Sequence, residues 1–183
     1  MKKIDKNSMP FFLRWLAPDY WASSTKDVSY PDLKKEGVKT VVFDIDSTLT
    51  PFNQNTVDPE VLESIQKAQR SGSIGEVAIA TNRRRMDFVD ITLQLGDEIE
   101  YVYALSFFNA KPFKKYFKRL FRKLHTKPKH AAMIGDKLFT DMIGAKRFGM
   151  VTVHVDRLGE DSVLDKLTPF RYIERWIVAR YHR

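Results

Sequence analysis

Residues 41–50 read VVFDIDSTLT, an apolar run that ends in two carboxylates, Asp44 and Asp46, with one apolar residue between them. Side chains two positions apart on a β-strand point to the same side, so a strand that continues through Asp46 brings both charges together. Like charges held close repel each other and raise the pKa of one of them, which gives folding little benefit. The stretch therefore predicts either a positively charged partner between the two carboxylates or a surface turn that weakens their repulsion.

Composition limits what this chain can be. Its 183 residues suffice for one well-buried domain, and 43% hydrophobic and 13% aromatic residues are typical of a globular protein. The absence of cysteine excludes disulfides, thiolate metal sites and cysteine nucleophiles. No apolar run approaches the roughly 20 residues that span a bilayer, and residues 1–21 do not have the pattern of a cleaved signal peptide. We therefore expect a soluble, cytoplasmic protein.

Strand-like and helix-like segments alternate from residue 40 onward. The predicted strands are 40–46, 76–81, 100–105, 130–136 and 150–156, and the predicted helices are 58–72, 84–96, 112–125, 138–149 and 168–183. This alternation favours right-handed βαβ units, which give an α/β fold with a central, mostly parallel five-stranded sheet flanked by helices. We expect residues 39–183 to form this domain and residues 1–38 to pack on it or extend it.

The polar residues that follow these strands are the candidates for a functional site. In open α/β sheets, ligands bind outside the carboxyl ends of the strands. The polar side chains expected at that edge are Asp44, Asp46 and Thr48, then Thr81 and Asn82, then Lys111, and finally Asp136 and Asp141. Four segments distant in sequence therefore offer acidic, hydroxyl and cationic groups to one site.

Four short motifs carry a resemblance to a known family. They are DIDST at 44–48, ATN at 80–82, AKP at 110–112 and IGDKLFTD at 134–141. In this order and spacing they resemble the four motifs of phosphatases of the haloacid dehalogenase (HAD) superfamily. Within it the chain looks most similar to the YqeG-like members of subfamily IIIA, whose relatives include phosphatidylglycerophosphate phosphatases. The resemblance implies a Rossmann-like HAD hydrolase domain at 39–183 and Mg²⁺-dependent hydrolysis of a phosphomonoester.

The resemblance also implies roles for the acidic residues. Asp44 is the expected nucleophile, which forms an aspartyl-phosphate and shares the metal. Asp46 is the expected acid and base, which protonates the leaving oxygen, activates water and offers its backbone carbonyl to Mg²⁺. Asp136 completes the metal site. Asp141 is either a further ligand or a partner that orients Lys111.

The remaining motif residues are expected to bind the phosphoryl group. Thr81 would donate its hydroxyl to a phosphoryl oxygen, although the same residue suits a helix cap. Asn82 is assigned to substrate binding beside it. Lys111 would neutralise charge on the nucleophile and on the transferring group. Arg83 and its two arginine neighbours stand at an expected helix N-terminus, where they either attract a phosphate-rich ligand or remain solvated.

The spacing of the motifs also bears on the substrate. About 30 residues separate Thr50 from Thr81, and about the same number separate Thr81 from Lys111, which leaves room for a helix but not for an inserted cap domain. An uncapped site would admit bulky substrates. The candidates are a lipid headgroup, a phosphoprotein, a nucleic-acid end or a small molecule closed in by a neighbouring subunit.

The net charge of +8 is concentrated in one segment, since residues 111–129 contain nine Lys or Arg and no Asp or Glu. Three interpretations stand: a solvated charged face, a surface for anionic lipid, or a surface for nucleic acid. Aromatic residues mixed with basic ones also occur in 10–21 and 168–183, as in interfacial anchors, although core packing explains them equally well. Peripheral contact with the inner face of a membrane is therefore one expectation for this chain.

Three hypotheses compete at this point. The first is an Mg²⁺-dependent phosphatase that acts through Asp44, with phosphatidylglycerophosphate as the best substrate by resemblance. The second is a soluble phosphatase for a sugar, nucleotide or protein phosphate. The third is a nucleic-acid-associated or ribosome-associated protein that retains the fold. The third is less favoured, because a binding protein need not keep Asp46, Lys111 and Asp136 together.

Overall fold

The computed structural model describes residues 1–84, 88–96, 99–159 and 169–182. The strands are β1 (Lys2–Lys3), β2 (Tyr20–Ala22), β3 (Thr40–Phe43), β4 (Glu76–Ala80), β5 (Glu100–Val102), β6 (Ala131–Gly135) and β7 (Val151–Val155). The α-helices are α1 (Phe11–Arg14), α2 (Tyr30–Lys35), α3 (Pro59–Arg70), α4 (Val89–Leu95), α5 (Lys114–Lys123), α6 (Ile143–Arg147) and α8 (Pro169–Ile177). Short 3₁₀ segments are η1 (Lys6–Ser8), η2 (Thr25–Asp27), η4 (Phe107–Asn109) and η5 (Pro128–His130), and π-helical turns are η6 (Leu138–Met142) and η7 (Val178–His182).

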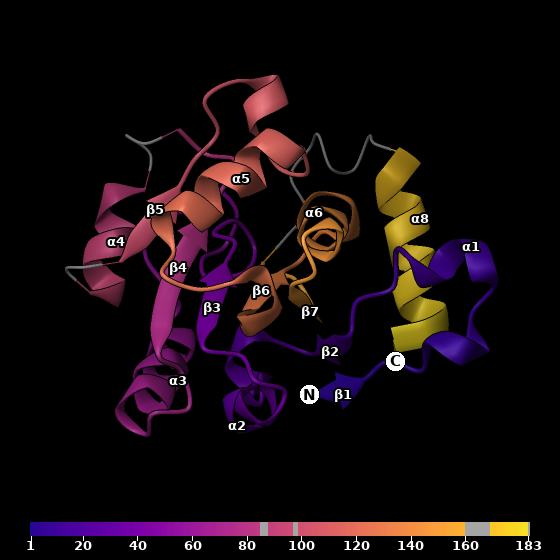
Figure 1. Ribbon diagram of the computed structural model, residues 1–183, viewed down its shortest axis with the longest axis horizontal. Helices are drawn as coiled ribbons and strands as arrows, with labels where there is room; N and C mark the ends of the chain where they lie inside the picture. The colour runs from indigo at the N-terminus through magenta and orange to yellow at the C-terminus, as the bar shows by residue number, and fades with distance from the viewer. Residues whose placement is uncertain (85–87, 97–98, 160–168, 183) are drawn as a thin grey trace.

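The strands form one sheet in the order β1-β2-β7-β6-β3-β4-β5 (Figure 1). Every pairing is parallel except the antiparallel pair of β1 with β2. The predicted α/β fold with a mostly parallel sheet is confirmed. The sheet has seven strands where the sequence predicted five, because the segment before residue 39 adds β1 and β2 at one edge.

Strand β2 joins the sheet beside β7, with Tyr20 opposite Val153 and Ala22 opposite Val155. The carboxylate of Asp19 fixes this register, since its Oδ2 accepts hydrogen bonds of 2.8 Å from both the backbone N–H and the hydroxyl of Thr152. A three-residue strand gains little by itself. Long-range hydrogen bonding to β7 is what makes this short segment extended.

Helices cover both faces of the sheet and produce two apolar clusters. On one face, Val41 and Phe43 of β3 pack in a cluster that includes residues of α2, α3 and α4. On the other face, Val42 of β3 packs in a cluster that includes residues of α1, α5 and α6. The alternation of neighbouring β3 residues between the two clusters is the pattern of a strand buried on both faces.

Some element boundaries differ from those predicted. Strand β3 ends at Phe43 rather than at residue 46, so the same-side argument for Asp44 and Asp46 does not apply to the observed backbone. Helix α5 begins at Lys114 rather than at Pro112, because Phe113 is extended. Helix α4 begins at Val89, and parts of the predicted helices 84–96 and 168–183 lie outside the described residues. Helix α3 follows its prediction, with Asp58 as N-cap and Pro59 in the first turn.

The connection between β3 and β4 is short. Residues 51–75 between β3 and β4 contain α3 and its flanking loops, and no inserted domain. In the described part of the chain, no helix combines the length and the hydropathy that a bilayer crossing requires.

Candidate active site

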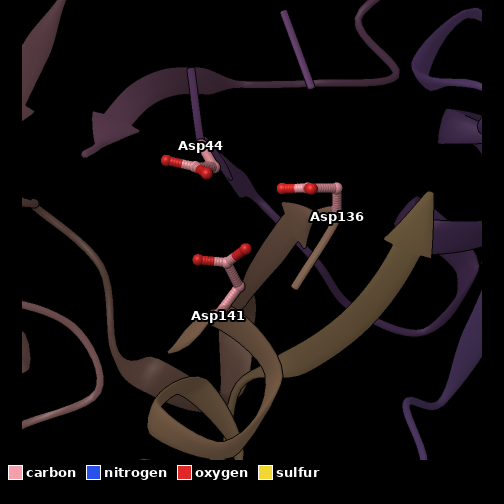
Figure 2. Close-up of side chains that lie close together, drawn as sticks. All are labelled: Asp44, Asp136 and Asp141. Carbon is pink, nitrogen blue, oxygen red and sulfur yellow. The ribbon is translucent and has the colours of Figure 1, made fainter. Parts of the chain in front are cut away.

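Three carboxylates from two neighbouring strands and one helical turn converge at the carboxyl edge of the sheet. Asp44 directly follows β3, Asp136 directly follows β6, and Asp141 lies in η6 after β6. Figure 2 shows the three side chains pointing toward one another. One oxygen atom from each lies within 4.8 Å of the others, and all three residues are buried. The adjacency of β3 and β6 in the sheet therefore creates an acidic cluster from residues about 90 positions apart in sequence.

Lys111 supplies a positive charge inside this cluster. Its Nζ lies 2.7 Å from Asp44 Oδ1 and 2.7 Å from Asp141 Oδ1. Burial alone would lower the pKa of Lys111, but the carboxylates of Asp141 and Asp44 hold it above its usual value. Burial also raises the pKa of Asp44, to about 6, since the nearby Asp141 opposes the favourable effect of Lys111. The lysine is therefore charged, and it holds two carboxylates in fixed positions.

Asp136 has a different cationic partner, Arg157, but its carboxylate oxygens accept no hydrogen bond in the described structure. The Nε of Arg157 lies 3.0 Å from Asp136 Oδ2, yet neither carboxylate oxygen makes a hydrogen bond of acceptable geometry with the described residues. Burial, together with the charge of Asp141, raises the pKa of Asp136 well above its usual value. A fully buried carboxylate without hydrogen bonds is costly unless a cation or a proton compensates for it.

Asp46 is directed to a different partner. The guanidinium of Arg83 binds both carboxylate oxygens, with Nη2 2.6 Å from Oδ1 and Nε 3.0 Å from Oδ2. The backbone N–H of Asn53 also donates to Oδ1, at 2.9 Å. Burial acts to raise the pKa of Asp46, but the hydrogen bonds from Arg83 and Asn53 hold it below its usual value. The two carboxylates of the opening stretch thus have separate cationic partners.

Thr81 and Asn82 follow β4 and contact the same region from the other side. The Oγ1 of Thr81 accepts the backbone N–H of Arg83 at 3.1 Å, and Thr81 is fully buried. The amide of Asn82 binds the backbone of Lys111 twice: Oδ1 accepts its N–H at 2.8 Å, and Nδ2 donates to its carbonyl at 3.3 Å. Asn82 thereby ties the end of β4 to the segment that carries the lysine.

The backbone around these residues is fixed by close packing. Ser47 has a φ of 61°, and its carbonyl and hydroxyl accept hydrogen bonds of 2.8 Å from the Leu158 N–H and from Arg157 Nη2. A Cβ on Gly135 would lie 2.4 Å from Oδ2 of Asp141, so only glycine permits this approach. The carbonyl of the buried Thr48 accepts the hydroxyl of Thr25 at 2.7 Å.

The acidic cluster concentrates carboxylate oxygens at one point. Lys111 and Arg157 form ion pairs with its three buried carboxylates (Asp44, Asp136 and Asp141), and the charge of Lys137 also acts on Asp136. The pair of Asp46 with Arg83 is neutral by itself. Oxygen-rich, negatively charged sites of this kind suit a hard divalent cation such as Mg²⁺. The two carboxylate oxygens of Asp136 accept no hydrogen bond in the described structure, which independently indicates a site for a cation.

Two residues of the site were not identified from the sequence. The sequence places Arg83 in a basic run at an expected helix N-terminus, but α4 begins six residues later and Arg83 binds Asp46 instead. Arg157 follows β7, and the rule that ligands lie beyond the carboxyl ends of strands, applied also to the fifth predicted strand, would have found it. The structure brings the other predicted residues together at this edge.

Comparison with solved structures agrees with this fold. A HAD phosphatase from Thermococcus onnurineus superposes with a TM-score of 0.54 and 19% sequence identity, over 69% of this chain and 90% of the other. An uncharacterized protein from Listeria monocytogenes serotype 4b superposes with a TM-score of 0.55 and 18% identity, over 78% and 98% of the two chains. At these identities the likeness concerns the fold.

Sequence comparison extends the likeness to named relatives. The chain is 26% identical over 171 residues to a probable phosphatase YqeG of Bacillus subtilis, covering 93% of this chain and 94% of the relative. It is 41% identical over 64 residues to a glyceraldehyde 3-phosphate phosphatase of Pyrococcus furiosus, but this match spans only 27% of that protein.

The fold and the four motif segments define a phosphatase of the HAD class. More narrowly, residues 14–158 match the family described as mitochondrial PGP phosphatase, and the chain belongs to that family.

Proposed function

We propose that this phosphatase is an Mg²⁺-dependent phosphomonoester hydrolase that works through an aspartyl-phosphate on Asp44. One observation carries the proposal: oxygens of Asp44, Asp136 and Asp141 lie within 4.8 Å of one another, while Lys111 binds two of these residues. A phosphate dianion repels a carboxylate nucleophile, so attack requires concentrated positive charge. Lys111 and a divalent cation at the acidic cluster would together supply it.

The acidic cluster fits Mg²⁺ because it offers carboxylate oxygens as ligands. Asp44 and Asp136 would provide carboxylate ligands, and the family pattern adds the backbone carbonyl of Asp46. Both oxygens of Asp141 already accept hydrogen bonds or an ion pair, from Lys111 and from the backbone N–H of Lys137, which favours the role of orienting Lys111 over that of ligand. Bound Mg²⁺ would offset the negative charge of the phosphoryl oxygens and of the nucleophile.

The first half of the reaction requires attack by the nucleophile on phosphorus and departure of the leaving oxygen. Lys111 binds Oδ1 of Asp44, which leaves Oδ2 to attack phosphorus as the bond to the leaving oxygen breaks. Thr81 accepts a hydrogen bond from Arg83, so its own hydroxyl proton is available to a phosphoryl oxygen. Asn82 holds the backbone of Lys111 and so fixes the position of the ammonium group. We therefore assign Asn82 to positioning Lys111 beside its expected contact with substrate.

The second half requires a proton carrier, and Asp46 takes this role. It gives a proton to the leaving oxygen and then accepts one from the water that attacks the aspartyl-phosphate, which releases phosphate and restores Asp44. Arg83 binds both oxygens of Asp46 and helps to hold its pKa low, so Asp46 is ionised in this arrangement. To act as the acid, Asp46 would have to take up a proton from solvent as one of these hydrogen bonds opens on binding of the phosphate ester.

Phosphatidylglycerophosphate is the substrate that we favour. The support is the match of residues 14–158 to a family described as mitochondrial PGP phosphatase, together with a connection between β3 and β4 that contains α3 and no inserted domain. A small phosphorylated metabolite is the alternative, consistent with the named phosphatases among the relatives.

The first test is the variant Asp44→Asn with an aryl phosphate and Mg²⁺. Activity should fall by at least about 1,000-fold, since a carboxamide cannot form the acyl phosphate. Asp58→Asn is the matched control, because Asp58 caps α3 and asparagine caps helices equally well. Acid-quenched wild-type protein should carry one phosphoryl group that hydroxylamine releases. Unchanged hydrolysis by Asp44→Asn would refute the mechanism.

The substrate is tested separately, by assaying phosphatidylglycerophosphate in mixed micelles against a panel of sugar and nucleotide phosphates with Asp44→Asn as the blank. A higher kcat/KM for a soluble ester than for the lipid would favour the alternative.

A further inference from the structure

The segment between β5 and α5 exposes large apolar side chains. Leu105, Phe107 and Phe108 are 59%, 75% and 66% exposed. The rings of Phe107 and Phe108 also contact each other and Phe113, with centroid separations of 5.3 to 5.7 Å. The tip of this segment is therefore an ordered aromatic cluster that the core does not cover. Contiguous exposed apolar residues of this kind mark interaction surfaces more often than single ones do.

A basic groove lies beside this cluster. It is lined by Asn109, Lys115, Lys118, Arg119 and Arg122, without an acidic side chain. The spacing of Lys115, Lys118 and Arg122 along α5 places them on one helical face, where like charges destabilise the helix. Arg119 is fixed by a 2.9 Å hydrogen bond from Nη2 to the carbonyl of Tyr103, and its guanidinium lies over the ring of the same residue. The groove thus presents the positive charge of the exposed Lys115, Lys118 and Arg122 to an anionic ligand.

The core takes the opposite face of α5. Tyr116, Phe117 and Leu120 are fully buried in the cluster that also contains residues of α6. The helix itself therefore cannot insert its apolar face into a membrane. Any apolar contribution to membrane binding has to come from the exposed aromatic residues of the segment that precedes α5.

This surface adjoins the catalytic edge. The same segment carries Lys111, whose Nζ contacts Asp44 and Asp141, and only one residue separates it from Asn109 in the groove. In Figure 1 the segment between β5 and α5 rises above the carboxyl-terminal edge of the sheet. A membrane bound to this segment would therefore have its lipid headgroups at the level of the active site.

We infer that residues 105–109 and the outer face of α5 dock the protein on an anionic membrane, with a phospholipid phosphate in the basic groove. The inference rests on the proposed function, because docking has value where the phosphate ester is membrane-borne. Exposed Phe and Leu side chains beside Lys and Arg are the composition of interfacial binding segments. A nucleic acid would instead use flat aromatic faces for base stacking, and here the rings of Phe107 and Phe108 meet edge to face.

Co-sedimentation with vesicles of phosphatidylcholine, with and without about one third phosphatidylserine, tests the inference. The wild-type protein should bind the anionic vesicles and lose binding as salt increases. Phe107→Ala/Phe108→Ala should weaken the partition coefficient at least about 10-fold and leave its salt dependence in place. Lys115→Ala/Lys118→Ala should weaken it on the order of 30-fold and flatten the salt dependence.

Two controls are matched to these variants. Lys127→Ala/Lys129→Ala removes the same charge from exposed positions next to the start of β6, at the opposite edge of the sheet, and should change binding less than 3-fold, since charge there lies far from the bilayer. Phe11→Ala removes an aromatic ring that is 86% exposed on α1 and should have no effect. Equal losses in the controls would overturn the inference, as would wild-type binding that is the same for neutral and anionic vesicles.

Activity toward a soluble aryl phosphate separates this inference from the proposed function. Both docking variants should hydrolyse it at the wild-type rate and lose activity only toward a phosphate ester presented in vesicles. If the vesicle substrate is cleaved equally by all variants, docking is wrong and the phosphatase assignment stands. Vesicle binding without any hydrolysis would remove the proposed function and leave docking intact. Tighter, variant-sensitive binding to RNA would identify a nucleic-acid surface instead and overturn the inference.

Discussion

Arg83 forms a bidentate ion pair with Asp46, at 2.6 and 3.0 Å, although the two residues are 37 positions apart. The same guanidinium donates to the carbonyl of Gln54 and to the side chain of Asn55. One side chain thus connects the end of β4 to the loop that follows the expected nucleophile. It also fixes the orientation of the carboxylate to which we assign proton transfer.

Arg83→Lys should reduce kcat, because lysine cannot bind both oxygens of a carboxylate. If Arg83 acts through proton transfer by Asp46, the loss should depend on the leaving group. We expect roughly a 10-fold loss with phenyl phosphate and little loss with nitrophenyl phosphate, whose leaving oxygen needs no proton. Arg84→Lys at the adjacent exposed residue is the control. Equal losses for the two substrates would mean that Arg83 supports only the loop.

Lys111→Met should destabilise the metal-free protein strongly. It leaves the buried carboxylates of Asp44 and Asp141 without their shared partner, and breaking a buried ion pair from one side typically costs about 3–5 kcal/mol. Urea unfolding in the presence of a chelator measures the change in the free energy of unfolding. Lys114→Met, at an exposed position three residues later, should change it by less than about 0.5 kcal/mol. A similar effect of the two variants would contradict the buried pairing.

The stability of the metal-free protein should depend on pH in an unusual direction. Burial raises the pKa of Asp44 to about 6 and that of Asp136 well above its usual value. The native state then binds more protons than the unfolded state above about pH 4, so stability rises as pH falls from about 7 to about 5. Asp46 has the opposite effect, because its pKa is lowered in the native state. Its protonation reduces the stability of the protein only at pH values below about 4.

Mg²⁺ should reverse this dependence, since it binds the deprotonated carboxylates. The gain in Tm on adding Mg²⁺ should be larger at about pH 7.5 than at about pH 5, and saturation at 100 times Kd corresponds to about 2.7 kcal/mol. Asp136→Asn should abolish most of the gain, whereas Asp90→Asn, at an exposed residue of α4, should preserve it. A gain that is independent of pH would place the ion elsewhere.

Gly135→Ala should disturb the acidic cluster more than the fold. Its Cβ would meet three atoms of Asp141 within 2.9 Å, so that side chain must leave its place beside Lys111. We expect weaker Mg²⁺ binding and at least about 10-fold lower activity. Gly144→Ala is the contrasting variant, because its Cβ would meet the ring of Phe117 at 2.2 Å, away from the cluster. It should lower stability by about 1–3 kcal/mol and leave the Mg²⁺ dependence of the remaining folded protein unchanged.

Much of the fold could be predicted because its signals are local. The strand at Thr40–Phe43 is a β-branched, apolar run, and α3 has both its N-cap at Asp58 and a glycine after its end. Strand β2 has no such signal. Tyr20–Ala22 is three residues of an aromatic segment that equally suits an interfacial anchor, and only pairing with β7 makes it a strand.

The site likewise contains residues whose position could be predicted from the sequence and residues whose position could not. Asp44, Thr81, Lys111 and Asp136 follow strands whose order along the chain could be predicted, so their meeting at one edge follows from the topology of a parallel sheet. The pairing of Arg83 with Asp46 depends on the course of the loop around Asn53, which has a φ of 58° and no sequence pattern that predicts it. Long, flexible cations can reach several carboxylates, and three-dimensional structure decides among them.

The pairing of β2 with β7 has a consequence for how the protein avoids self-association. Without it, β7 would present five residues of unpaired backbone, a ready template for another chain. Strand β2 covers that template, and the exposed border is reduced to the two lysines of β1. Charged, very short borders are how natural sheets resist edge-to-edge aggregation. The N-terminal segment therefore protects solubility at one border of the sheet, while through Thr25 it supports the catalytic loop at another.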